Sequence, residues 1–213
     1  MFDYEFLAVL AEIAQFLPGF LFAVAFHEFA HASVANFLGD DTAKKSGRLT
    51  LNPFVHIDWL GILFLMLFRI GWARPVPINH NNFKYPKLYS ILTALAGPAA
   101  NFLFAIVCFL GMRYFPYNLF VEPFSKSVIQ LLDATASINV MLGVFNLLPI
   151  PPLDGSHVFT AFLSGRYPRL IFWLYTYSMF ILIFILFFPL TRFWLLATIQ
   201  WVYFFLRNLV FKF

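Results

Sequence analysis

The chain has few charged residues and almost no cysteine. Only 11% of its 213 residues are charged, whereas about a quarter are charged in a typical soluble domain. A single cysteine excludes an intramolecular disulfide. The sequence also contains no internal repeat, no low-complexity tract and no polar block large enough for an appended soluble domain. These absences exclude an ordinary soluble fold and a disulfide-stabilised one.

Hydrophobic residues instead make up 62% of the chain, and aromatic residues 21%. Stretches such as residues 90–112 and 171–189 carry no charge at all. About 20 apolar residues in a helix cross the ~30 Å hydrocarbon core of a bilayer. The sequence therefore predicts an all-α polytopic membrane protein, a single domain over residues 1–213 with about five to six transmembrane helices. The expected spans lie near residues 19–38, 89–112, 127–148, 170–190 and 193–207.

Two interruptions divide the first third of the chain. We expect Pro18-Gly19 to separate an N-terminal piece near residues 4–16 from a helix at about 19–38, because proline removes a helix hydrogen bond. The apolar segment 59–68 has only ten residues. That length is too short for a helical span and predicts a re-entrant hairpin that enters the membrane and returns.

The net charge of +4 comes mainly from short loops, a pattern that favours membrane orientation over nucleic-acid binding. Two cationic loops, at residues 39–58 and 71–88, flank the short apolar segment, and the positive-inside rule places both in the cytoplasm. If the short segment does not cross, the loop at 149–168 is cytoplasmic as well. The charges concerned are Lys44, Lys45, Arg48, Arg69, Arg74, Lys84 and Lys87, followed by Arg166 and Arg169.

The apolar stretch FLFAVAFHEFAHASVANFLG, residues 20–39, carries His27, Glu28 and His31 at its middle. Two histidines four residues apart lie on one face of a helix, a turn apart. This HExxH spacing suits two neutral imidazoles that bind one zinc ion, with the glutamate beside it to accept a proton from water. An unpaired charge at bilayer depth costs about 2.5 to 3.5 kcal/mol, and zinc binding gives the three groups a common purpose.

A catalytic zinc usually has three protein ligands and one open position. The best candidate for the third ligand is Asp154 in NLLPIPPLDGSHVF, residues 146–159, where prolines break the preceding helix and Gly155 frees the backbone. The expected topology places Asp154 on the same side of the membrane as His31. By chemistry alone His157 and His56 are also possible ligands, although we expect His157 beside the metal or at the surface.

These motifs, in this order, resemble the site-two protease family of intramembrane zinc metalloproteases. The resemblance spans roughly residues 20–160 and rests on HEFAH at 27–31 and NLLPIPPLDG at 146–155. It is strongest to the compact prokaryotic branch, without a PDZ-like domain or a nucleotide-sensing extension. Three stretches between the motifs support it: GDDTAKKSGRLTLNPFVHIDWLG at 39–61, GWARPVPIN at 71–79 and AGPAANFLFA at 96–105.

The resemblance implies hydrolysis of a peptide bond within or near a transmembrane segment of another membrane protein. Carried over, His27, His31 and Asp154 would bind Zn²⁺ and Glu28 would activate the water. It also implies a multi-pass protein of a prokaryotic cell membrane, whose active site opens toward the cytoplasm. Its partners would be the bilayer and a transmembrane protein substrate, and the oligomeric state stays open. The catalytic core would occupy about residues 19–160, followed by C-terminal helices at about 170–207.

Three further polar residues have roles that the sequence alone leaves open. Asn146 could hydrogen-bond a substrate carbonyl or oxyanion, or it could cap backbone groups freed by the prolines. The resemblance places His56 near the active site, where it could contact substrate. Asn101, in AGPAANF, is interpreted as a packing and hydrogen-bonding residue at a close helix approach.

Two other functions compete with proteolysis. Histidines and carboxylates within membrane spans also mark ion pathways, so a zinc-binding membrane transporter is the first alternative. The second is a proteolytically inactive scaffold, whose catalytic positions would be free to change. Glu28 distinguishes them, because a transporter could bind its ion with glutamine there, whereas hydrolysis would lose its general base.

Overall fold

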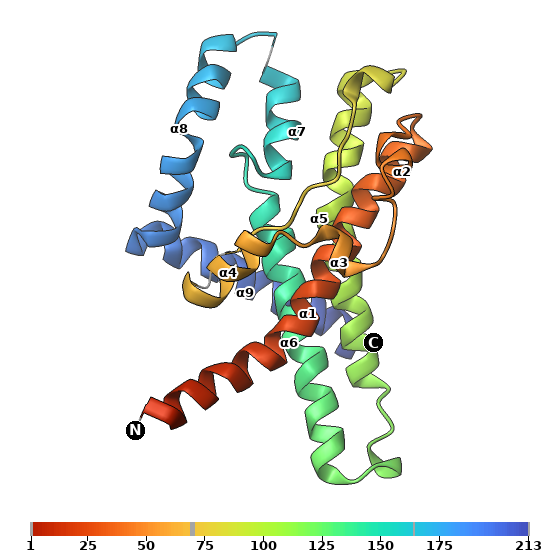
Figure 1. Cartoon of the computed structure of the whole chain (residues 1–213), viewed down its shortest axis with the longest axis vertical. Coiled ribbons are helices and arrows are strands. Elements are labelled where there is room, and N and C mark those ends of the chain that lie inside the picture. Colours follow the sequence, from red (N-terminus) through yellow and green to blue (C-terminus); the bar gives the residue numbers. More distant parts are fainter. Residues whose placement is uncertain (1, 69–70, 164, 213) are drawn as a thin grey trace.

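The computed structural model describes residues 2–68, 71–163 and 165–212, with side chains described at 16–64, 71–117, 119–163 and 165–212. The described residues form helices and loops and no strand apart from an isolated antiparallel bridge between Ile57 and Ala73. The elements in chain order (Figure 1) are α1 Phe2–Phe37, α2 Thr42–Lys45, α3 Pro53–His56, α4 Trp59–Phe68, η1 His80–Asn82, α5 Pro86–Arg113, η2 Tyr117–Leu119, α6 Glu122–Asn146, α7 Asp154–Leu163, α8 Pro168–Phe187 and α9 Pro189–Phe211.

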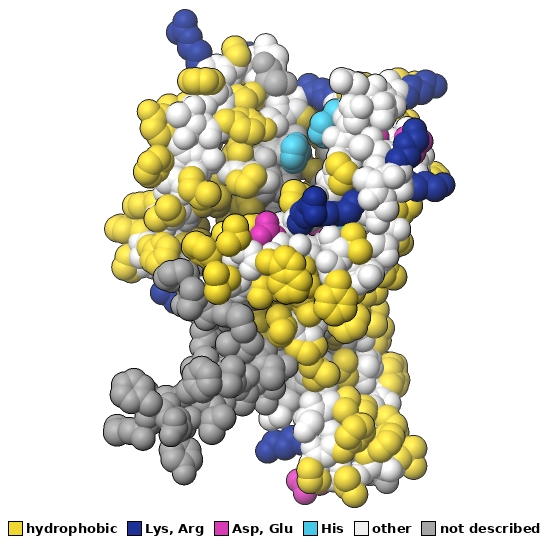
Figure 2. All heavy atoms as spheres, in the orientation of Figure 1, with side chains coloured by type: hydrophobic (Ala, Val, Ile, Leu, Met, Phe, Trp, Pro, Cys, Tyr) yellow, Lys and Arg dark blue, Asp and Glu magenta, His cyan; other side chains and the backbone are white. Residues whose placement is uncertain are grey.

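Five of the described helices are long and apolar enough to cross a membrane: the Phe16–Phe37 part of α1, and α5, α6, α8 and α9. The prediction of an all-α polytopic membrane protein is thereby confirmed. Between 39% and 44% of the apolar windows of α1, α5 and α6 is buried, against 6% in α8 and α9. The first three helices therefore form the interior of the molecule. Hydrophobic side chains cover much of the face shown in Figure 2.

Helices α5 and α6 run antiparallel, and α1 crosses them obliquely (Figure 1). Fully buried small side chains on α1, such as Ala23 and Ala32, allow this close helix packing. A second cluster joins α5, α6 and α9, with Phe109 and Val140 fully buried and Leu206 packed against them. The C-terminal helix α9 thus packs against α5 and α6, the two helices that α1 crosses.

The predicted helix break at Pro18-Gly19 is wrong. Helix α1 runs continuously from Phe2 to Phe37 with Pro18 inside it. Proline removes one backbone N–H and crowds one carbonyl, but the remaining hydrogen bonds of a long helix persist. Proline is tolerated in membrane helices because neighbouring groups satisfy the backbone that it frees. A single proline is therefore a weak sign of a helix end in this setting.

The short apolar segment forms α4, Trp59–Phe68, with the predicted bounds. The chain then returns, because Ile57 pairs with Ala73 and the Arg74 N–H donates to the His56 carbonyl at 2.9 Å. The segments before and after α4 therefore form a hairpin. The depth of this hairpin in the bilayer stays a prediction. Arg69, one of the charges counted for orientation, lies outside the described residues.

The two cationic loops that flank α4 are bound to each other through Asp40. This fully buried carboxylate accepts hydrogen bonds from the Asn79 N–H at 2.8 Å and from the Asn82 side chain at 2.7 Å. Lys45 and Lys84, one in each loop, are exposed. The contact brings the two loops together, and their cytoplasmic location stays a prediction.

This arrangement predicts how the loops react with a thiol reagent. Cysteines introduced as Lys45→Cys and Lys84→Cys, each in a Cys108→Ser background, should both resist a membrane-impermeant reagent in intact cells, because the positive-inside rule places both loops in the cytoplasm. Both should be modified fully once the cells are permeabilised. Modification of one site without the other in intact cells would mean that the chain crosses the membrane between them.

Candidate metal centre

Helix α1 presents His27 and His31 to the same side, one turn apart. Both side chains are buried, and their Nε2 atoms lie 3.0 Å from each other. The ring centroids are 4.6 Å apart and the ring planes are nearly perpendicular. The four-residue spacing therefore brings the two imidazole nitrogens to one point, as the motif predicts.

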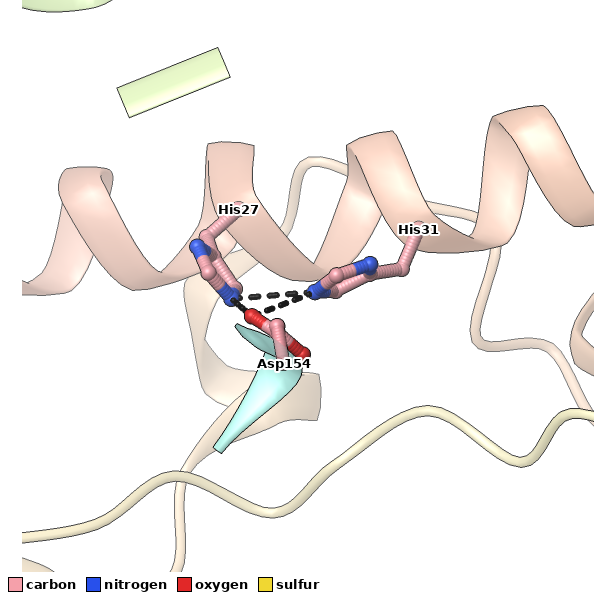
Figure 3. Close-up of side chains that lie close together, drawn as sticks. All are labelled: His27, His31 and Asp154. Carbon is pink, nitrogen blue, oxygen red and sulfur yellow. Dashed lines mark hydrogen bonds and ion pairs between the residues drawn. The ribbon is translucent and has the colours of Figure 1, made fainter. Parts of the chain in front are cut away.

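Asp154, more than 120 residues farther along the chain, lies beside the two histidine Nε2 atoms. Helix α6 ends at Asn146, residues 147–153 turn back, and α7 begins at Asp154. The turn is tight at Gly155, where a Cβ would lie 2.2 Å from the Leu147 carbonyl oxygen. Asp154 Oδ2 consequently lies 3.0 Å from His27 Nε2 and 3.3 Å from His31 Nε2 (Figure 3).

Hydrogen bonds from α1 to α5 fix the protonation of both imidazoles. His27 Nδ1 lies 2.6 Å from Asn101 Oδ1, and His31 Nδ1 lies 2.7 Å from the Thr93 carbonyl oxygen. Neither oxygen carries a proton, so each Nδ1 must donate. In a neutral imidazole the Nε2 atom then keeps its lone pair. Both lone pairs point toward Asp154.

The Asn101 amide is oriented by its own partners. Its Nδ2 group donates to the Ala23 carbonyl at 3.1 Å and to Asn139 Oδ1 at 2.9 Å. Its oxygen is therefore the atom that faces His27. The structure agrees with the prediction of a hydrogen-bonding residue at a close helix approach and adds its partner, which is a histidine of the motif.

These three ligand atoms suit a metal ion. Two imidazole lone pairs and a carboxylate oxygen lie 3.0 to 3.3 Å apart, and among the described groups no hydrogen-bond partner is found for the buried Asp154 Oδ2. Tetrahedral zinc with bonds of about 2.0 to 2.1 Å separates its ligand atoms by about 3.3 Å. The donor set and its spacing therefore fit zinc.

Asp154 completes the ligand set. A carboxyl group binds a metal ion in its ionised form. Together with the two histidines Asp154 forms the group of three ligand residues that the structure brings within 4.8 Å of one another.

Gly97 on α5 closes another side of the centre. A Cβ at this position would lie 2.3 Å from His31 Nε2 and 2.6 Å from His27 Nε2. Any side chain would therefore occupy the space beside the two lone pairs. The glycine is required for α5 to approach the histidines closely enough to accept their Nδ1 hydrogen bonds.

Glu28 is buried beside the histidines and is held by the backbone. Its Oε2 accepts a hydrogen bond from the Val76 N–H at 2.9 Å. The Pro75 carbonyl, in the same peptide unit, accepts from the buried Arg48 guanidinium at 3.2 Å, and the Arg74 carbonyl accepts at 2.6 Å. The chain between α4 and α5 is thereby fixed against the glutamate. The hydrogen bond from the Val76 N–H uses Oε2 of Glu28 and does not involve Oε1.

A cavity of about 250 Å³ opens beside the three ligands and the glutamate. It is reached from solvent, and both Glu28 and Asp154 contribute to its wall. Reacting groups could therefore meet at this point without crossing the protein interior. Its lining residues are Glu28, His31, Pro75, Val76, Ile78, His80, Ser90, Thr93, Ala94, Pro152, Asp154 and His157.

The other candidate residues lie in different settings. His56 is fully buried, with Nε2 2.9 Å from the Thr50 carbonyl oxygen, and it does not line the cavity. Asn146 ends α6 and is half-buried outside the cavity lining. His157 lines the cavity from α7, one turn after Asp154.

Sequence reasoning missed several groups at the site. The Thr93 carbonyl and the Val76 N–H are backbone groups, which leave no signal in residue type. Gly97 could have been found from its place in AGPAANF, where small residues indicate close helix contact. His80 is far from the motifs in the sequence and gave no signal.

Comparison with known proteins finds similarity to one family of peptidases. A model of peptidase family M50 matches residues 117–187, which include Asp154 but not the HExxH motif. The chain is similar to peptidase family M50 over this stretch, in agreement with the resemblance that the second motif indicates. No solved structure gives a significant match.

Curated proteins match this chain over longer stretches than the family model does. "Putative zinc metalloprotease YwhC" of Bacillus subtilis is 44% identical over 134 residues, 62% of this chain and 61% of that protein. "Putative zinc metalloprotease Rip2" of Mycolicibacterium smegmatis is 28% identical over 192 residues, 88% of this chain and 72% of its own length. "Zinc metalloprotease MJ0392" of Methanocaldococcus jannaschii is 34% identical over 84 residues, 39% of this chain and 23% of its own.

The close approach at Gly97 predicts a large effect of one methyl group. Gly97→Ala should displace the imidazoles and lower the metal affinity by at least about 10-fold, the lower end of the loss seen when groups that orient metal ligands are changed. Metal content per purified chain is the measurement. Gly111→Ala on the same helix is the matched control, because its Cβ would meet only the Leu132 side chain at 3.4 Å. Equal metal content in both variants would contradict the role of Gly97.

Proposed function

We propose that this protein is an intramembrane zinc metalloprotease, which hydrolyses a peptide bond within or near a transmembrane segment of a membrane protein substrate. The observation that supports this most is the meeting of His27, His31 and Asp154 beside Glu28 at an open cavity. Two imidazoles, one carboxylate and an adjacent general base are the set that a hydrolytic zinc site requires. The relatives named as zinc metalloproteases support the same chemistry.

The proposed mechanism assigns each residue one task. His27, His31 and Asp154 would hold the zinc ion, with the histidine tautomers fixed by Asn101 and the Thr93 carbonyl. When bound, zinc lowers the pKa of a coordinated water toward about 7 and polarises the scissile carbonyl.

Glu28 accepts the proton that the water loses. Its Oε2 is held by the Val76 N–H, so we assign the role of proton acceptor to Oε1. The same carboxyl group then carries the proton to the amine nitrogen of the leaving segment, so that it returns to the ionised form. The fixed orientation favours this transfer because the acceptor need not reorient before each step.

The cavity also limits the form of the substrate. At about 250 Å³ it is smaller than a typical drug-sized pocket, and it is bordered by the loop segment around Val76 rather than by a wide groove. A helix of about 10 Å diameter with its side chains does not enter such a space intact. We therefore propose that the substrate segment unwinds locally and enters as extended chain.

The setting in the cell is part of the proposal. We propose that the active site opens toward the cytoplasm, because the positive-inside rule places the cationic loops joined through Asp40 there. We propose a prokaryotic cell membrane because the relatives of this chain come from bacteria and an archaeon. This chain matches 61% of the length of YwhC, so the activity, substrates and partners of the whole protein are proposals.

Glu28→Gln should abolish cleavage while zinc stays bound. The amide oxygen can still accept from the Val76 N–H, but the side chain cannot take the proton, and removal of a general base typically costs about 10² to 10⁴-fold in rate. The measurement is cleavage of single-pass membrane proteins in cells that express either form, followed by zinc analysis of both purified proteins.

The control is the wild-type protein treated with phenanthroline, which should lose activity and regain it when zinc is added back. Cleavage close to the wild-type rate in Glu28→Gln would assign the general base to another group. Full activity in a verified metal-free sample would exclude the zinc mechanism.

The third ligand can be tested against its competitors. Asp154→Asn should lose zinc by more than the about 10 to 100-fold that follows changes around metal ligands, because the neutral amide replaces an anionic ligand. His157→Ala should retain the tightly bound ion, since His157 lies outside the triangle of ligand atoms, and so should folded His56→Ala. Zinc is measured by mass spectrometry after dialysis that removes weakly held ions. Retention in Asp154→Asn together with loss in His157→Ala would reverse the assignment.

A further inference from the structure

A second pair of histidines lies in the wall of the same cavity. His80 belongs to η1 in the loop before α5, and His157 belongs to α7. Their ring centroids are 6.0 Å apart, with ring planes inclined by 36°. Histidine side chains are visible in the hollow of the upper half of the face in Figure 2. This pair takes no part in the proposed proteolytic mechanism.

The free nitrogen of His80 follows from its hydrogen bonds. Ser90 Oγ donates to the Pro86 carbonyl at 2.6 Å, so its hydroxyl proton is already used. His80 Nδ1, at 2.6 Å from the same Oγ, must therefore donate to it. The neutral ring is left with a lone pair on Nε2 and, because His80 is exposed, with access to solvent.

His157 is also neutral, as a metal ligand must be. Burial lowers the pKa of its imidazole, and the neighbouring His80 lowers it further, while Asp154 opposes both. The groups that face it are His80 from the loop, His31 from α1 and Asp154 on its own helix. The carboxylates of Asp154 and Glu28 in the same cavity wall give the space a negative character that favours a cation.

We propose that His80 and His157 form a second, weaker binding site for a divalent cation of the zinc type. An ion about 2.0 to 2.1 Å from each ligand nitrogen lies about 3.2 Å from each ring centroid, and a tetrahedral ion places two such centroids about 5.2 Å apart. The 6.0 Å between His80 and His157 is within about 1 Å of that separation, so a small movement of the exposed His80 ring lets the two rings share an ion. Water would complete the coordination on the solvent side. Two protein ligands instead of three, and the exposure of His80, make this site the weaker of the two.

Because of its position in the cavity wall, the second site would regulate cleavage. This inference rests on the proposed proteolysis. An ion held between His80 and His157 occupies the wall of the cavity through which a substrate segment would reach Glu28 and Asp154. Zinc in excess of the catalytic ion would then obstruct the site. Activity should therefore fall as free zinc rises above the level that fills the tighter site.

The direct test counts ions. Purified protein, equilibrated by dialysis over a range of free zinc, should bind two ions per chain with affinities that differ by at least about 10-fold. The double variant His80→Ala/His157→Ala should lose the weaker ion and keep the tighter one. Asn81→Ala is the matched control, because Asn81 is the exposed neighbour of His80 outside the cavity wall, and it should bind two.

The outcomes separate this proposal from the proposed function. One ion per chain in wild type, or two in the double variant, would overturn the second site. His27→Ala/His31→Ala should lose the tighter ion and keep the weaker one, so absence of the tighter ion from wild type would instead count against the catalytic centre.

The second arm compares each protein with itself. The ratio of cleavage in excess zinc to cleavage with the tighter site just filled should be well below one for wild type and for Asn81→Ala, and near one for the double variant. Equal ratios in wild type and the double variant would overturn the proposal that an ion at the second site obstructs the substrate path.

Discussion

The site depends on two buried hydrogen bonds between α1 and α5. His27 and His31 each donate from Nδ1 to an oxygen of α5, and this alone directs both Nε2 lone pairs to the point that Asp154 reaches. Such bonds are short enough only if the helices nearly touch, which Gly97 permits. The close contact between α1 and α5 therefore fixes the tautomer of each histidine, and the tautomer fixes the direction of the lone pair that binds the metal. The polar groups that would be costly in lipid are satisfied by each other.

The general base is held in a comparable way by backbone. Glu28 binds the N–H of the Pro75–Val76 peptide unit, while Arg48 binds its carbonyl and the carbonyl of Arg74. A buried carboxylate and a buried guanidinium thus act on opposite edges of one peptide group. These two side chains hold the segment around Val76 in place, and Asp40 holds the same loop farther along at Asn79 and Asn82.

Much of this could be predicted from the sequence, because the strongest signals were local. Apolar length gave the spans, and HExxH gave the two imidazoles at one point. Asp154 required only helix-breaking prolines and a consistent topology. The partner of Asn101 and the contribution of His80 could not be predicted, since both arise from contacts between segments distant in the chain. Pro18 misled because a membrane helix retains enough hydrogen bonds to continue through a proline.

Helices α8 and α9 show which residues occur in a membrane helix when little protein packs against that helix. Only 6% of their apolar windows is buried, and large rings such as Phe172, Phe180 and Trp201 are 74%, 71% and 67% exposed. Fluid acyl chains adapt to almost any apolar shape, so these positions are under selection for solubility in lipid rather than for fit. Evolution can exchange one large hydrophobic residue for another there freely, whereas Leu206, on the inner side of α9, is held to a single shape by its neighbours.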